Sequence, residues 1–97
     1  MKDRTLEKLS RRNEKVYVYL ADREIGNRFL RDAEKEGFTF GDGKKPTSRS
    51  YAEIMAVNSD RTINYLGSIG RIAFGSGAKK VGGRYLLRVD YKKYVNG

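Results

Sequence analysis

The sequence predicts an α+β fold: a single small domain with a largely antiparallel sheet of four to five strands, one long amphipathic helix packed on one face, and a short helical N-terminal arm. Three observations lead to this prediction. A chain of 97 residues has room for one core. In residues 16–20 aliphatic side chains alternate with tyrosines, as in a strand with one buried face. In residues 22–36 the apolar side chains have the spacing of a helix. Further short apolar runs are bounded by turn-forming residues.

Residues 1–15 are expected to form a basic arm ahead of the domain at residues 16–97. This segment holds six basic and three acidic residues. Its two leucines, Leu6 and Leu9, have an i, i+3 spacing that fits a short helix. We expect a solvated helical turn or two that packs weakly or becomes ordered on a partner.

The next segment predicts a strand followed by the long helix. Val16, Val18 and Leu20 alternate with two tyrosines, which gives a strand its two faces. Asp22 is the expected N-cap of the helix, and Gly37 lies where a left-handed residue ends one. The apolar residues between them share one helical face; they are Ile25, Phe29, Leu30 and Ala33. The expected core is Phe29, Leu30, Val18, Leu20 and Val89.

Residues 38–45 combine a short strand with a glycine- and lysine-containing loop. A phosphate-binding P-loop has its glycines between a strand and the following helix and ends in Gly-Lys-Ser or Gly-Lys-Thr. Here Gly43-Lys44 is followed by Lys45-Pro46, and no helix start is signalled. We therefore interpret this loop as a turn between strands.

The second half of the chain predicts the remaining strands. Residues 53–57 and 62–66 are expected to be strands joined by a polar turn at 58–61, and residues 85–91 a further strand. Residues 67–83 are ambiguous because they are rich in glycine; the pattern favours a short helix capped by Ser68, then a glycine-lysine loop. The β-α-β opening at residues 16–40 would also allow a parallel pair with a right-handed crossover.

Composition excludes several kinds of chemistry. Without cysteine or histidine, disulfides, thiolate sites and histidine-based acid–base or metal chemistry are ruled out, and no cofactor is expected. A carboxylate cluster of Asp42, Glu53 and Asp90 could be imagined, but their spacing does not require it, so an enzyme ranks below a binding protein. No apolar run approaches the length of a membrane span, so we expect a cytoplasmic protein that does not contact membranes.

The positive charge is unevenly distributed along the chain. The net charge is +9, with basic residues concentrated at both ends and in the loop after Gly43. Cationic side chains interleaved with tyrosines suit nucleic acid, because phosphates pair with the charges and bases stack on the rings. Alternatively, these tyrosines belong to the core and the charges only aid solubility. The predicted contacts with nucleic acid or an acidic partner are Lys44, Lys45, Arg49, Lys79, Lys80, Arg84, Arg88, Lys92 and Lys93, with Tyr91 and Tyr94 as aromatic contacts.

About half the chain resembles small proteins of bacteriophages and mobile elements, especially from Gram-positive bacteria. The resemblance rests on residues 15–40, which end in Gly37-Phe38-Thr39-Phe40, and on IMAVNSDRTINYLG with its Thr62-Ile63-Asn64-Tyr65 strand. Proteins of this kind are similar to host-defence antagonists, including anti-CRISPR proteins. The resemblance implies a non-enzymatic inhibitor that binds a nucleic-acid-guided or nucleic-acid-processing complex of a bacterial host.

Two hypotheses about function follow. In the first, the protein is a phage-type inhibitor acting by stoichiometric binding to a host nuclease or ribonucleoprotein. Because it is basic, it cannot imitate DNA, so its contacts would be guide RNA, bound DNA or an acidic protein surface. In the second, it is a small accessory protein that binds DNA or RNA without sequence preference.

Overall fold

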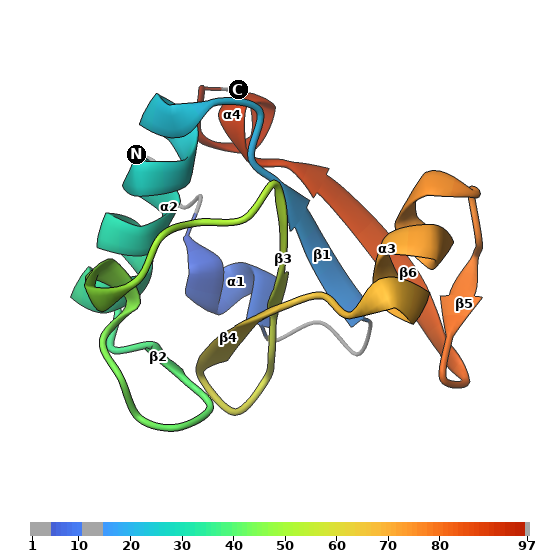
Figure 1. The fold of residues 1–97 in the computed structure, drawn as a ribbon, viewed down its shortest axis with the longest axis horizontal. Coiled ribbons are helices and arrows are strands. Elements are labelled where there is room, and N and C mark those ends of the chain that lie inside the picture. Colours follow the sequence, from blue (N-terminus) through green and yellow to red (C-terminus); the bar gives the residue numbers. More distant parts are fainter. Residues whose placement is uncertain (1–4, 11–14, 97) are drawn as a thin grey trace.

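The computed structural model describes residues 5–10 and 15–96, shown as a ribbon in Figure 1. Helices, strands and one 3₁₀ turn (η1) follow one another along the chain. They are α1 (Leu6–Ser10), β1 (Lys15–Tyr19), α2 (Arg23–Lys35), β2 (Thr39–Phe40), η1 (Pro46–Ser48), β3 (Ile54–Val57), β4 (Thr62–Tyr65), α3 (Ser68–Gly75), β5 (Lys80–Val81), β6 (Arg84–Asp90) and α4 (Tyr91–Asn96). The α+β class is confirmed.

The described strands form one mixed six-stranded sheet with the order β2-β4-β3-β1-β6-β5. The prediction of four to five largely antiparallel strands is therefore wrong in two respects. The short strand β5 comes from the glycine-rich segment and pairs with β6. Two neighbouring pairs are parallel, β1 with β6 and β2 with β4. The parallel pair that the β-α-β opening at residues 16–40 would allow does not form, because β3 and β4 lie between β1 and β2.

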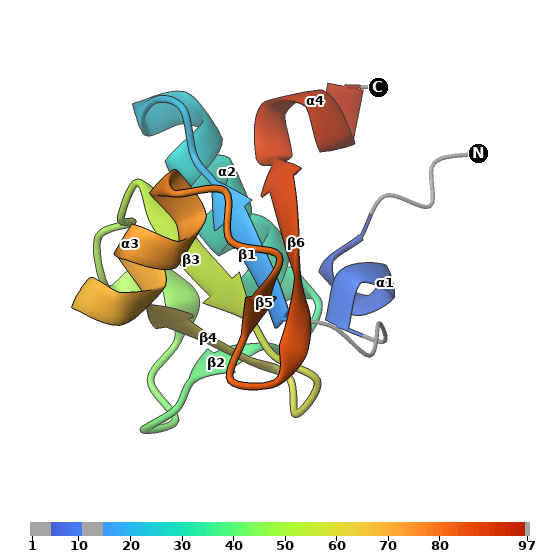
Figure 2. The same cartoon turned by 90° about the vertical axis from the view of Figure 1, so that its right-hand side faces the viewer.

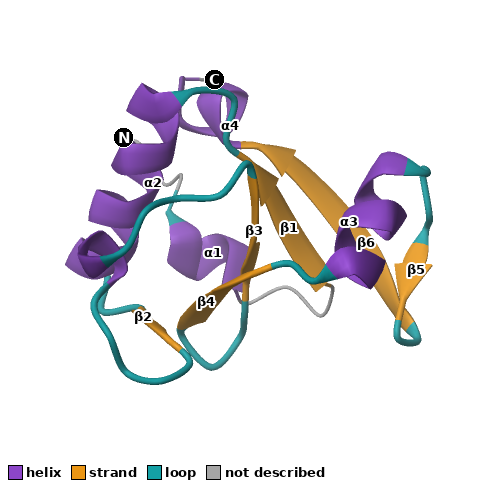
Figure 3. Ribbon diagram, viewed as in Figure 1, coloured by secondary structure: helices purple, strands orange, loops and turns teal. Residues whose placement is uncertain are grey.

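Helices cover both faces of the sheet. Val16 and Val18 of β1 belong to the core that also contains apolar residues of α1, α2 and α4. Tyr17 points to the other face, where its hydroxyl lies beside Gly70 of α3. Figure 2 shows α1 and α3 on opposite sides of the strands, and Figure 3 shows that the long connection from β2 to β3 is mostly loop.

The predicted core is confirmed. Phe29 and Val18 are fully buried, and the other expected core residues, Leu30, Leu20 and Val89, are at most 9% exposed. The boundaries of α2 also follow the sequence signals. The Asp22 side chain accepts a hydrogen bond from the Ile25 N–H, and Gly37 has the positive φ of 84° that ends the helix.

The N-terminal arm departs from the prediction. Most of residues 1–15 lie outside the described residues, but α1 packs into the core rather than weakly on the surface. Leu6 is 0% and Leu9 5% exposed. The Glu36 carboxylate accepts hydrogen bonds from the N–H groups of Leu6 and Glu7 at 3.1 and 2.8 Å. This cap, 30 residues distant in sequence, fixes α1 to the end of α2.

The C-terminal strand also ends earlier than predicted, since Tyr91 begins α4 instead of closing β6. The Tyr91 ring is fully buried and meets Phe29 edge to face, with 5.3 Å between ring centroids. Its hydroxyl donates to Asp32 of α2 at 2.6 Å. This contact turns the chain from the sheet back onto α2.

Candidate partner-binding surfaces

The basic residues predicted to bind a partner lie in three separate places. Figure 1 shows the β2–β3 loop at one end of the molecule, β5 and β6 at the other, and α4 beside the start of α2. The largest of these groups is Lys79, Lys80, Arg84 and Arg88, on β5, β6 and the turn before β5.

In the loop group, Lys44 and Lys45 are exposed but Arg49 is engaged within the loop. Its guanidinium pairs with Asp42 and stacks 4.7 Å from the centroid of the Phe40 ring. The hydrogen bond from Arg49, together with one from the Lys44 N–H, lowers the pKa of Asp42. Arg49 therefore supports the loop, and the free positive charge here comes from the two lysines.

In the α4 group, both predicted aromatic contacts have structural roles. Tyr91 is in the core, so its ring is not open to stacking on a base in this fold. Tyr94 is partly buried and donates its hydroxyl to the Thr5 carbonyl at 2.8 Å, which ties α4 to the start of α1. Lys92 and Lys93 remain exposed. The sequence prediction ended a strand at Tyr91, whereas the chain becomes helical there, and the alternation of cations and tyrosines did not reveal that both rings pack within the fold.

The third group belongs to a basic projection that we call the hairpin lobe: α3, β5 and residues 84–88 of β6. The chain from residue 61 to residue 89 contains six basic residues and no acidic residue. Two consecutive glycines with positive φ, Gly82 and Gly83, form the tight turn of the hairpin. Its exposed basic side chains are Arg71, Lys79, Lys80 and Arg84.

Exposed apolar side chains accompany this charge. Ile72 is 68% and Tyr85 60% exposed. The Lys80 ammonium lies 4.8 Å from the centroid of the Tyr85 ring. A ring flanked by cations is suited to stacking on a base or another flat group while phosphates pair with the charges. Sequence reasoning missed Arg71, although the long stretch without acidic residues could have marked it. Ile72, which the helical pattern of this segment was expected to turn inward, is exposed instead.

Arg88 holds the lobe together and is not displayed on its surface. Its guanidinium donates to the carbonyls of Ala73, Phe74 and Ala78 at 2.8, 3.0 and 2.8 Å. The first two carbonyls lie in the last turn of α3, where a cation interacts favourably with the helix dipole, and the third follows the helix. Arg88 therefore fixes α3 to β6 and orients the exposed residues around it.

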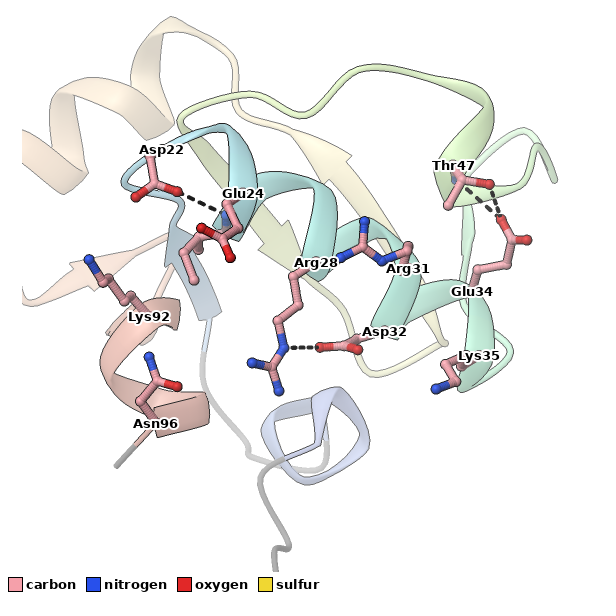
Figure 4. A pocket seen from close by; sticks show the side chains of 11 residues that line it. Asp22, Glu24, Arg28, Arg31, Asp32, Glu34, Lys35, Thr47, Lys92 and Asn96 are labelled. Carbon is pink, nitrogen blue, oxygen red and sulfur yellow. Dashed lines mark hydrogen bonds and ion pairs between the residues drawn. The ribbon is translucent and has the colours of Figure 1, made fainter.

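An open depression of about 910 Å³ runs along the outer face of α2 and α4. Figure 4 shows the side chains that line it. Its charges are balanced, with Asp22, Glu24, Asp32 and Glu34 facing Arg28, Arg31, Lys35 and Lys92.

Three of its four acids are already engaged within the fold. Asp22 caps α2, and Asp32 pairs with Arg28 and accepts from Tyr91. Glu34 accepts two hydrogen bonds from Thr47, which lower its pKa. The depression thus fits a solvated helix face.

Within residues 5–10 and 15–96, no three Asp or Glu side chains gather closely enough to hold a metal ion. In the same part of the chain, no helix has the length and apolar character needed to cross a membrane.

Comparisons of the chain with protein families, with curated proteins and with solved structures found no match.

Proposed function

We propose that this protein acts by binding an anionic, nucleic-acid-containing partner through the hairpin lobe. The observation that supports this proposal is the lobe itself, which exposes four cations together with Ile72 and Tyr85 and contains no acidic residue. The other two basic groups have less to offer a ligand, because their aromatic residues and Arg49 are engaged within the fold.

The specific form that we propose is a phage-type inhibitor that binds stoichiometrically to a host nuclease or ribonucleoprotein. The support for this form is the sequence resemblance of residues 15–40 and 54–67. A basic lobe would reach guide RNA or bound DNA in such a complex, or an acidic protein surface. The alternative, an accessory protein that binds DNA or RNA directly, uses the same surface.

The first experiment measures the salt dependence of binding to single- and double-stranded oligonucleotides. The lobe variant carries Arg71→Gln, Lys79→Gln, Lys80→Gln and Arg84→Gln. If all four residues contact phosphates, the slope of log affinity against log salt should flatten by about 3, since each contact contributes roughly −0.7 to −0.9.

A matched control removes the same amount of charge elsewhere, through Lys44→Gln, Lys45→Gln, Lys92→Gln and Lys93→Gln. The control should keep most of the slope, and both variants should melt like the wild type, because exposed charges contribute little to stability. Equal flattening by the two variants would mean that only net charge matters. Binding that does not depend on salt would indicate an apolar protein–protein interface.

A second measurement separates the two forms of the proposal. The inhibitor should bind a preassembled nucleoprotein complex more tightly than the naked nucleic acid it contains. The accessory protein should bind both equally, or prefer the naked strand.

A further inference from the structure

A second concave site lies beneath the first turn of α3, on the face of the sheet opposite to α2. We call it the α3 pocket. It measures about 430 Å³ and is open to solvent. The sheet contributes Lys15, Tyr17 and Asn64, and the strand-to-helix turn contributes Gly67, Ser68 and Gly70. Of the described residues that line it, none is acidic.

The first turn of α3 presents unused hydrogen-bond donors to this pocket. Gly67 is the N-cap, in extended conformation, and it supplies no side chain to cap the helix. The first backbone hydrogen bond of the helix runs from the Arg71 N–H to the Gly67 carbonyl. The N–H groups before Arg71 therefore have no acceptor within the helix, and the helix dipole adds positive potential there.

Tyr17 independently indicates a ligand at this place. The residue is only 7% exposed, yet its hydroxyl forms no hydrogen bond with any residue in the described part of the chain. No buried polar side-chain atom of the described residues lacks a partner, so the hydroxyl itself is open to the pocket although its ring is buried. The hydroxyl points to the first turn of α3, 3.3 Å from where a side chain on Gly70 would begin. It remains in contact with the pocket.

The remaining polar groups fit an anion. Lys15 lines the pocket, and its side chain has no ion pair with any residue that the structure describes. Ser68, the first residue of α3, also lines the pocket. The absence of a side chain at Gly70 leaves room, because a Cβ there would already lie 3.1 Å from Leu66.

We infer that the α3 pocket binds a phosphate group. Backbone N–H groups of the first turn, the Ser68 and Tyr17 hydroxyls and the Lys15 ammonium would donate to its oxygens. Helix N-termini after a glycine-containing turn suit phosphate for this reason. This inference rests on the proposed function in taking nucleic acid as the source of the phosphate, because α3 belongs to the hairpin lobe. A free nucleotide carries the same chemistry.

The test is a set of amide NMR titrations of the intact protein with inorganic phosphate, a mononucleotide, and an oligonucleotide with and without a 5′-phosphate. The amide signals of Ser68 and Gly70 should shift with each phosphate-containing probe. Lys15→Gln should weaken binding about tenfold, since hydrogen bonds to charged groups are the stronger kind. Tyr17→Phe removes only the hydroxyl and should weaken binding about threefold or more.

Tyr19→Phe is the matched control, because Tyr19 lies on the same strand and does not line the pocket. It should bind like the wild type. If Lys15→Gln does not fold, Tyr17→Phe decides the question alone. Unshifted Ser68 and Gly70 signals, or wild-type affinity in Tyr17→Phe, would overturn the inference.

The outcomes also separate this inference from the proposed function. One outcome is that the lobe variant flattens the slope of log affinity against log salt while phosphate does not shift the amide signals of Ser68 and Gly70. In that case the lobe binds nucleic acid and the pocket does not. If phosphate and the mononucleotide bind at the pocket but no oligonucleotide binds, the pocket is a nucleotide site and the proposed function is wrong. A preference for the 5′-phosphorylated strand would identify a terminal phosphate as the ligand.

Discussion

Tyr91 connects the end of the chain to the long helix through both its ring and its hydroxyl. The ring packs edge to face against Phe29, and the hydroxyl donates to Asp32. Burial raises the pKa of Tyr91, and the neighbouring Asp32 raises it further. The folded protein therefore favours the protonated phenol, which can donate the hydrogen bond.

We expect this hydrogen bond to make the protein sensitive to alkaline pH. The folded-state pKa is raised, so the stabilisation is complete below the ordinary tyrosine pKa of about 10 and decreases as pH rises above it. One such group contributes a slope of about 1.4 kcal/mol per pH unit in that range. Urea unfolding between pH 8 and pH 11 should show a shallower decrease for Tyr91→Phe than for wild type.

Tyr85→Phe is the matched control for this measurement, since Tyr85 is 60% exposed. Its stability should follow the wild-type pH profile. If Tyr91→Phe and wild type lose stability in parallel, ionisation of Tyr91 does not cause the loss of stability at alkaline pH.

Gly26 is a residue whose small size is required by packing. It lies in the second turn of α2, where glycine normally costs about 1 kcal/mol relative to alanine. A Cβ at this position would lie 2.3 Å from Cγ of Tyr51. The absent side chain lets the Tyr51 ring lie directly against the helix.

Gly26→Ala should therefore destabilise the protein by about 1–3 kcal/mol, the usual cost of overpacking. In a Tyr51→Ala background the same change should instead stabilise it by up to about 1 kcal/mol, through helix propensity. Chemical denaturation of the four proteins in this double-mutant cycle measures both effects. Stabilisation by Gly26→Ala alone would show that Tyr51 moves away at little cost.

At the scale of the elements, α1 shows how a short helix becomes part of the fold. Five residues are too few to form a helix alone in water. Two external supports hold this one: Leu6 and Leu9 are buried in the core, and Glu36 caps the first turn. Arg61 adds an ion pair to Glu7 and a hydrogen bond to the Glu36 carbonyl.

Leu6→Ala should therefore cost about 2–5 kcal/mol, the range for buried leucines. This is comparable to the effect expected for Leu30→Ala in α2, whose side chain is equally buried. Thermal or urea unfolding of the two variants makes the comparison. A change below about 0.5 kcal/mol for Leu6→Ala, typical of surface positions, would instead support the weakly packed arm expected from sequence.

Elements with local signals were predictable, and those that depend on distant residues were not. Asp22, the apolar face of α2 and Gly37 all lie within one stretch of chain, so the helix and its ends could be predicted. The cap of α1 comes from Glu36, and the start of α4 depends on contact between Tyr91 and α2. Neither partner can be identified from local periodicity.

The same distinction applies to the candidate sites. The positive charge of residues 79–84 could be predicted from composition, whereas the structural role of Arg88 depends on carbonyls of α3 that fold back onto it. The α3 pocket was missed because its residues come from β1, β4 and the turn before α3. Only the sheet order brings them together.

At the scale of the whole molecule, one end is basic, whereas one helix face carries equal numbers of positive and negative charges. The hairpin lobe has only basic charges, whereas the depression along α2 and α4 has equal numbers of both signs. Such asymmetry orients a protein as it approaches an anionic surface, and it raises the association rate at low salt. We therefore expect the lobe to make first contact with a nucleic-acid partner.

The position of β1 at the centre of the sheet has a consequence for the time course of folding. One of its neighbours, β6, begins almost 70 residues later in the chain. During synthesis at about 5–20 residues per second, β1 waits roughly 4–14 s for this partner. Until then one edge of a strand with two buried valines stays unpaired, which is a recognised route to aggregation. Because pairing over such a long loop is intrinsically slow, the nascent chain depends on the last quarter of its sequence to close its own sheet.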